Sequence, residues 1–142
     1  MDLQDPTSKM SKSSDTAGVV SMLDEPSVIL RKFKRAVTDS DSEVRYDREA
    51  KPGVSNLLDI LAAATGDTQD VLAEKYSQYG PLKADTGEAV VAMLEPVQKR
   101  YVELMADRGE LANLLRKGSH KAGAVAAATL QRAYDAIGFL PR

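Results

Sequence analysis

The sequence contains no cysteine and no tryptophan, and it has a single histidine, His120. Without cysteine the chain can form no disulfide, no thiolate metal site and no cysteine nucleophile. One histidine excludes a His-rich cluster, so we expect no metal site. No apolar run approaches the roughly 20 residues that a membrane span needs, and the first ten residues lack the apolar stretch of a signal peptide. We therefore expect a cytoplasmic protein with no membrane partner.

The chain has 142 residues, which is enough for one compact domain with a real core. Its 19 basic and 21 acidic side chains give a net charge of −2, which excludes a uniformly basic surface. The charge is uneven, because residues 57–107 carry four basic and nine acidic side chains whereas residues 108–142 carry six and two. The basic end would suit a polyanion. Ordinary variation in charge between helix surfaces is the alternative.

The spacing of apolar residues predicts helices and no strands. Helical spacing covers roughly residues 26–37, 55–65, 67–79, 82–107, 110–116 and 119–137. We expect Asp24 to cap the first helix, Pro96 to kink or divide the long one, and Gly118 with Ser119 to separate the last two. The predicted fold is an all-α helical bundle, with a polar loop over residues 1–24 and a helical domain over residues 25–142.

The same spacing predicts which side chains face the core. In the first helix these include Phe33 and Val37, and in the third Val71 and Leu72. The predicted apolar stripe of the long helix consists of Val90, Met93, Leu94, Val97, Tyr101, Leu104 and Met105. The predicted inward stripe of the last helix is Ala126, Leu130, Ala133, Tyr134 and Ile137.

A five-residue motif, Lys9-Met10-Ser11-Lys12-Ser13, stands out in the polar loop. Two lysines three residues apart can converge on one pyrophosphate, and serine hydroxyls can donate to the same oxygens. Such a group fits a reaction in which a carboxylate attacks the α-phosphorus of ATP and pyrophosphate leaves, because the leaving group needs positive charge around it. The alternative is a solvated Lys/Ser linker.

The motif resembles the second signature of class I aminoacyl-tRNA synthetases. Residues 34–66 resemble the segment that follows this signature in bacterial tryptophanyl-tRNA synthetases. The blocks that carry the resemblance are Asp5-Pro6-Thr7, AVTDS at residues 36–40 and KPGVSNLL at residues 51–58. The last helix, with Lys121-Ala122 and Ala136-Ile137-Gly138, is similar to that family's C-terminus. The resemblance covers essentially the whole chain.

The resemblance implies a tryptophan–tRNA ligase, which activates tryptophan with ATP and then transfers it to its tRNA. It implies that Lys12 is the main catalytic lysine on the ATP phosphates. Lys9, Met10, Ser11 and Ser13 complete the ATP-binding loop, with magnesium only as the counter-ion of ATP. It further implies that the helices after the loop bind the tRNA anticodon and that the full-length enzyme is a homodimer.

The sequence departs from that family in one large respect. The nucleotide-binding α/β half, with its His-x-Gly-His type motif, and the tryptophan pocket are missing. We therefore expect a C-terminal fragment that is inactive alone. Two other hypotheses remain: a stand-alone, non-catalytic tRNA- or RNA-binding helical module, and an all-α interaction domain without a ligand.

Three further groups of residues have a functional and a structural interpretation. Arg116, Lys117 and Lys121, at the predicted helix junction beside Gly118, would contact tRNA phosphates or form a solvated turn. We expect His120 to be an exposed helix residue. The acidic residues between positions 39 and 49 are expected to pair with Arg45 and Arg48. Most tyrosines are expected in the core, although they could stack on anticodon bases; they are Tyr46, Tyr76, Tyr79, Tyr101 and Tyr134.

Overall fold

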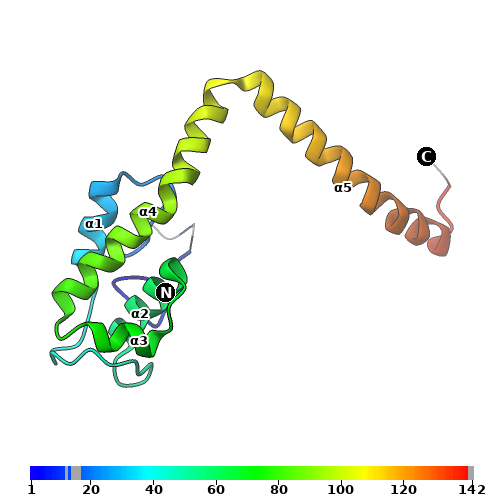
Figure 1. Cartoon of the computed structure of the whole chain (residues 1–142). Helices are drawn as coiled ribbons and strands as arrows, with labels where there is room; N and C mark the ends of the chain where they lie inside the picture. The colour runs from blue at the N-terminus through cyan, green and yellow to red at the C-terminus, as the bar shows by residue number, and fades with distance from the viewer. Residues whose placement is uncertain (12, 14–16, 141–142) are drawn as a thin grey trace. The chain divides into compact units, whose positions relative to one another are not determined.

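The computed structural model describes residues 1–11, 13 and 17–140. Over these residues it contains five α-helices and no strand, which confirms the predicted all-α fold (Figure 1). The chain divides into two compact units, Met1–Gln98 and Lys99–Arg142, and each is described by itself. No helix in the described part of the chain has the length and apolar character required to cross a membrane. The helices are α1 (Pro26–Lys34), α2 (Pro52–Thr65), α3 (Gln69–Lys75), α4 (Tyr79–Ala106) and α5 (Arg108–Ile137).

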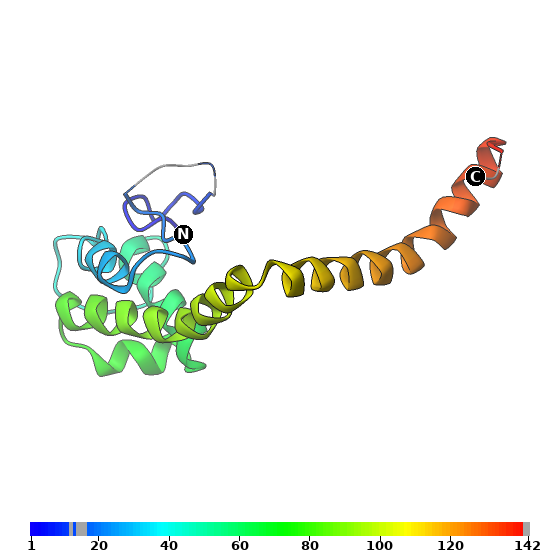
Figure 2. The ribbon, with the colours of Figure 1, turned by 90° about the horizontal axis from the view of Figure 1, so that it is seen from above.

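The core of the first unit is built around α2. Leu57 and Leu58 of this helix are completely buried. Helix α1 packs against α4 at Gly87, where a Cβ atom would lie 3.2 Å from the side chains of Leu30 and Phe33. Figures 1 and 2 show these two helices side by side. The buried apolar cluster consists of Leu3, Ile29, Phe33, Ala36, Val54, Leu57, Leu58, Leu61, Ala62, Leu72, Leu82, Val90 and Leu94.

The structure confirms one predicted helix end and contradicts one predicted helix cap. Helix α2 ends at Gly66, whose φ of 84° is the left-handed conformation that glycine adopts readily, as predicted. The predicted cap of α1 is wrong, because the N-cap residue is Glu25. The Asp24 carboxylate instead accepts hydrogen bonds from the Ser21 backbone N–H at 2.9 Å and from Lys32 Nζ at 2.6 Å.

Helix α4 is continuous through Pro96, which excludes a division at this residue; the kink, the other expected effect, stays a prediction. A proline removes one backbone hydrogen bond, and the hydrogen bonds on either side of it maintain the helix. The burial of this helix also ends earlier than the apolar pattern predicts, because Leu94 is its last buried residue. Beyond it on the predicted stripe, Leu104 is partly buried. The exposed residues of the stripe are Met93, Val97, Tyr101 and Met105.

The second unit contains α5, which runs unbroken through Gly118. The predicted break at Gly118 and cap at Ser119 are therefore wrong. A glycine inside a helix costs only about 1 kcal/mol relative to alanine, and the alanine-rich sequence beyond it favours helix. The cap is instead Asp107, whose side chain accepts from the Glu110 N–H at 2.9 Å. The predicted end at Gly138 is confirmed, with φ at 74°.

None of the residues of α5 is buried, so the predicted inward stripe of the last helix is wrong. Leu130 is 51% exposed and Ile137 is 62% exposed. Val37 and Val71 were also expected inside and are exposed. For Val37 the reason is local: the helix ends before it, and its backbone N–H donates to the Leu3 carbonyl at 2.7 Å. Helical spacing thus identifies an apolar face without showing that another element covers it.

Candidate functional site

The structure describes four residues of the five-residue motif at positions 9–13. Lys12 lies outside the described residues, so its role stays a prediction. Lys9 is exposed, and Met10 is partly buried against the core. The hydroxyls of Ser11 and Ser13 are 3.0 Å apart and share a hydrogen bond. These residues therefore offer a cation and two hydroxyl groups beside an apolar side chain that holds this part of the loop to the core.

The chain enters the motif through a closed turn over residues 2–8. The backbone N–H of Asp2 donates to the Ser8 carbonyl at 2.8 Å. The Asp2 carboxylate accepts from the backbone of Gln4 at 2.7 Å. The Asp5 carboxylate accepts from the hydroxyls of Ser8 and Thr7, each at 2.6 Å. The hydrogen bonds from Ser8 and Thr7 hold the pKa of Asp5 below its usual value.

The two ends of the loop are tied together. The Leu3 N–H donates to the Gly18 carbonyl at 3.0 Å, and the Leu3 carbonyl accepts from Val37. Gly18 is buried, and a Cβ atom on it would lie 1.7 Å from Asp2 Oδ1. On the exit side, Lys32 Nζ of α1 donates to the Val19 carbonyl at 2.7 Å. The absence of a side chain at Gly18 is therefore what allows the two ends to meet.

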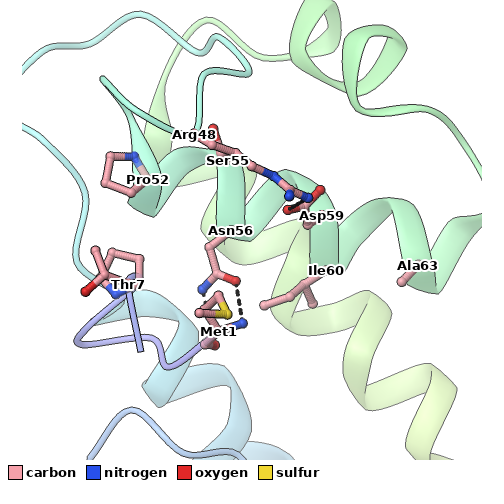
Figure 3. Close-up of a pocket in the computed structure, with 10 residues that line it drawn as sticks. Met1, Thr7, Arg48, Pro52, Ser55, Asn56, Asp59, Ile60 and Ala63 are labelled. Atoms are coloured by element: carbon pink, nitrogen blue, oxygen red, sulfur yellow. Dashed lines mark hydrogen bonds and ion pairs between the residues drawn. The ribbon is translucent and has the colours of Figure 1, made fainter. Parts of the chain in front are cut away.

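Helix α2 supports the entry side of the loop through Asn56, which is only 5% exposed. Its Oδ1 accepts from the Met1 nitrogen at 2.8 Å, and its Nδ2 donates to the carbonyls of Met1 and Asp2 at 3.3 and 3.4 Å (Figure 3). Beside this contact is a cavity of about 460 Å³ between the turn and α2. On its rim, Arg48 and Asp59 form an ion pair at 3.0 Å.

A charged cluster fixes the segment between α1 and α2. Lys51 has a side chain only 4% exposed, and its Nζ lies 2.9 Å from Asp41 Oδ2 and 3.4 Å from Asp39 Oδ1. It also donates to the Tyr79 hydroxyl at 3.0 Å, and Tyr79 donates to Asp39 at 2.6 Å. The cluster thus joins the segment to the first residue of α4.

The pKa values of this cluster follow from its contacts. The hydrogen bond with Tyr79 outweighs the effect of burial and, with those to Asp41 and Asp39, raises the pKa of Lys51. Burial would raise the pKa of Asp39, but hydrogen bonds from Tyr79, the Asp41 backbone and Lys51 outweigh it and lower that pKa. The pKa of Asp41 is lowered chiefly by the hydrogen bond from Lys51. All three charges are therefore stabilised by the fold.

The predicted pairing of the acidic segment is confirmed for Arg45, which forms ion pairs with Glu43 and Asp47. Arg48 pairs instead with Asp59 of α2. Two of the three remaining acidic side chains, Asp39 and Asp41, form ion pairs with Lys51. Among residues 1–11, 13 and 17–140, no group of three or more acidic or histidine side chains could hold a metal ion.

The basic residues predicted to contact tRNA all lie in α5 of the second unit. Arg116, Lys117 and Lys121 are exposed, and so is His120, as expected. Because α5 is continuous here, the helix N-terminus that was to supply backbone amides at Ser119 does not exist. These side chains could therefore contact an anion only through their own charges.

The tyrosines separate into two groups. Three are partly buried and bind carboxylates through their hydroxyls: Tyr46 bonds to Asp59, Tyr76 to Asp85 and Tyr79 to Asp39. Tyr101 is 44% exposed, so its predicted place in the core is wrong. Tyr134 is partly exposed, and its ring lies 5.6 Å from that of Phe139.

Sequence reasoning assigned no structural role to Asn56 or Lys51, although both carried a signal. Each is a polar residue in the strongly apolar segment at positions 51–62. A buried polar side chain needs hydrogen-bond partners, so its presence there indicates a specific contact. Gly18 carried a weaker signal, because a glycine in a polar loop usually indicates only a turn.

The chain has a family match and similar solved structures. Residues 1–95 match the family model described as tRNA synthetases class I (W and Y), so the chain belongs to this family. It is 53% identical over 144 residues to the tryptophan–tRNA ligase of Mycobacterium leprae and 54% identical over 142 residues to tryptophan–tRNA ligase 1 of Streptomyces coelicolor. The crystal structure of tryptophanyl-tRNA synthetase from Mycoplasma pneumoniae is similar with a TM-score of 0.86 and 33% sequence identity.

These matches cover nearly the whole chain but only part of each relative. They include 99% of this chain and 42% of each of the two ligases. For the Mycoplasma structure the shares are 99% and 43%. The chain therefore spans about two fifths of the length of the relatives that it matches.

Proposed function

We propose that this chain supplies the ATP loop and the tRNA-binding helices of a tryptophan–tRNA ligase. In the first step of that reaction the carboxylate of tryptophan attacks the α-phosphorus of ATP, a P–O bond forms, and the bond to pyrophosphate breaks. The observation that carries the proposal is the loop with the Lys9–Ser13 motif, whose two ends are tied to each other beside a buried core. A second step transfers the aminoacyl group to the tRNA of tryptophan.

In this proposal, the loop stabilises the charge that develops on pyrophosphate. Lys12 is the main cation and Lys9 the second, while the hydroxyls of Ser11 and Ser13 donate to phosphate oxygens. Magnesium accompanies ATP as its counter-ion and is bound by none of these residues. Met10 packs on the core, so it holds the middle of the loop while the polar side chains engage the nucleotide.

The tRNA-binding part of the proposal rests on the basic second unit. Arg116, Lys117 and Lys121 are exposed on α5, and residues 108–142 carry six basic and two acidic side chains. Such charges bind phosphates without reading the sequence. A stand-alone RNA-binding module would use the same residues, and it is the second candidate function. It predicts tRNA binding by this chain alone, with an affinity that falls steeply as salt is added.

A fusion protein tests the ATP loop. We would join this chain to the N-terminal part of the Mycobacterium leprae ligase that the match does not include, and measure tryptophan-dependent exchange of pyrophosphate into ATP. Lys12→Ala should lower the exchange rate by about 100-fold, as expected when one preorganised charge contact to the transition state is lost. Lys75→Ala is the matched control, since Lys75 is exposed and forms an exposed ion pair with Asp67.

Two measurements decide the proposal: exchange by the Lys12→Ala fusion and exchange by the unfused chain. Full exchange activity in the Lys12→Ala fusion would overturn the role of the loop. The unfused chain should show no exchange, since the proposal assigns tryptophan binding to the other part of the ligase. Exchange by the unfused chain would contradict the proposed inactivity of the chain alone.

A further inference from the structure

We propose that Asn56 is a positioning residue for the ATP loop: through its side-chain amide, α2 sets where the two ends of the loop lie. The proposal rests on the proposed function for its catalytic consequence, but its structural part can be tested separately. Asn56 does not belong to the Lys9–Ser13 motif. It lies in the middle of the most buried helix of the first unit, and its side chain faces the loop entry (Figure 3).

The contact matches the chemistry of an amide. One side chain must accept from the Met1 nitrogen and donate to the carbonyls of Met1 and Asp2. Only an uncharged amide offers both an oxygen acceptor and an N–H₂ donor in one short group. An aspartate would keep an acceptor for the Met1 ammonium group, but it would lose the N–H₂ donor and place a negative charge against two carbonyl oxygens. An apolar residue would remove all three of these hydrogen bonds.

Leu3 connects the entry of the loop to its exit. Leu3 follows the two residues that Asn56 binds, and its side chain is 1% exposed. Its N–H donates to the Gly18 carbonyl at 3.0 Å, and its carbonyl accepts from Val37 at 2.7 Å. The Asp2 carboxylate then lies against Gly18, where no Cβ atom would fit. A displacement of residues 1 and 2 therefore moves both ends of the loop.

The catalytic consequence is a loss of preorganisation. Lys9 follows directly after the turn at residues 2–8, so the position of that turn limits where its cation can reach. Charges stabilise a transition state best when they are held in place before the reaction. Loosening the ends of the loop should therefore lower kcat more than it raises the KM for ATP.

Limited proteolysis of the full 142-residue chain tests the structural part. Trypsin cleavage after Lys9 reports opening of the loop, whereas cleavage after Lys83, within α4, reports unfolding of the core helices. In Asn56→Ala the ratio of the Lys9 rate to the Lys83 rate should rise about tenfold, which corresponds to the loss of one or two net hydrogen bonds. Mass spectrometry of early time points measures both rates.

Two further variants separate positioning from general destabilisation. Leu94→Ala removes a buried side chain of α4 and destabilises the core, so it should raise the Lys83 rate and lower the ratio instead of raising it. Gly18→Ala adds a methyl group that would lie 1.7 Å from Asp2 Oδ1, so it should raise the ratio without altering α2. If Asn56→Ala does not fold, Gly18→Ala still tests the connection between the loop ends. An unchanged ratio in folded Asn56→Ala, or in Gly18→Ala where Asn56→Ala does not fold, would overturn the proposal.

The fusion described above tests the catalytic part. In Asn56→Ala, kcat for pyrophosphate exchange should fall about tenfold with less than a twofold change in the KM for ATP, because the loss falls on the transition state. A rise in KM alone would overturn positioning in favour of simple binding. If Lys12→Ala leaves the exchange rate unchanged while Asn56→Ala still raises the proteolysis ratio, the proposed function is wrong. The positioning of the loop ends by Asn56 is then still supported.

Discussion

Lys51 shows what one buried charge does for the first unit. Its ammonium group contacts two carboxylates and the hydroxyl of Tyr79, so the segment between α1 and α2 is fixed at its centre. A buried charge that loses its partners is costly, whereas a fully paired one is tolerated and restricts the chain to one arrangement. Lys51 therefore restricts the path of the segment over residues 35–51 at Asp39 and Asp41.

The cluster predicts how stability depends on pH. Since the fold lowers the pKa of Asp39 and Asp41, their contribution is present above the ordinary value of 3.8 and is lost as the pH falls through the folded-state values. The fold raises the pKa of Lys51, so its contribution is present below 10.5 and is lost as the pH rises towards its folded-state value. Both changes should appear in thermal unfolding midpoints measured from pH 2 to 11.

Lys51→Met should lower the midpoint at pH 7, because Asp39 and Asp41 lose their cation. It should also flatten the decline between pH 5 and 2, since those two carboxylates then titrate closer to their ordinary values. Lys75→Met is the control, because its ion pair with Asp67 is exposed and contributes little. If the Lys51→Met curve runs parallel to that of the wild type, the cluster does not control the acid response.

At the scale of single elements, α2 was largely predictable and α5 was not. The sequence predicts that α2 ends at Gly66 and buries one apolar stripe, and the structure confirms both. The residues of this stripe are Leu57, Leu58, Leu61 and Ala62. In α5 the weak helix propensity of Gly118 suggested a break, but one glycine cannot overcome the propensity of its neighbours. The contacts of Asn56 and Lys51 could not be predicted, since they join residues far apart in the chain.

The continuity of α5 gives a direct prediction for Gly118→Ala. A Cβ atom at this position meets no atom within 4 Å, so the methyl group adds no clash. Alanine should then stabilise the helix by about 1 kcal/mol and increase the helical signal in circular dichroism. Gly66→Ala is the contrasting variant, because its φ of 84° disfavours any side chain. A loss of helical signal in Gly118→Ala would show that the chain does bend at this position.

At the scale of the whole molecule, the two units differ in how they are stabilised. The first has an apolar cluster with contributions from all four of its helices, whereas α5 in the second has no buried residue. Helices without tertiary packing are marginal in water, so most of the protein's stability resides in residues 1–98. The predicted boundary between a polar loop over residues 1–24 and a helical domain over residues 25–142 stays a prediction.

Hydrogen exchange should reveal this difference. Amides of α5 should exchange at least about 100-fold faster than those of residues 54–62, because local opening of an unpacked helix needs little free energy. Exchange measured by mass spectrometry at several protein concentrations provides the test and its control. Equal protection at low concentration would contradict the prediction. Protection that grows with concentration would show that copies of the chain cover the exposed apolar side chains of α5.

The hydrogen bond from the Leu3 N–H to the Gly18 carbonyl closes the motif-bearing loop at its base. The length of the loop is therefore not set by the helices of the core. Once a loop is closed at its base, each doubling of its length costs only about 0.6 kcal/mol. Residues could therefore be added to the loop without altering the core. The side chains proposed to engage the nucleotide are thus a different set from those that close the base of the loop.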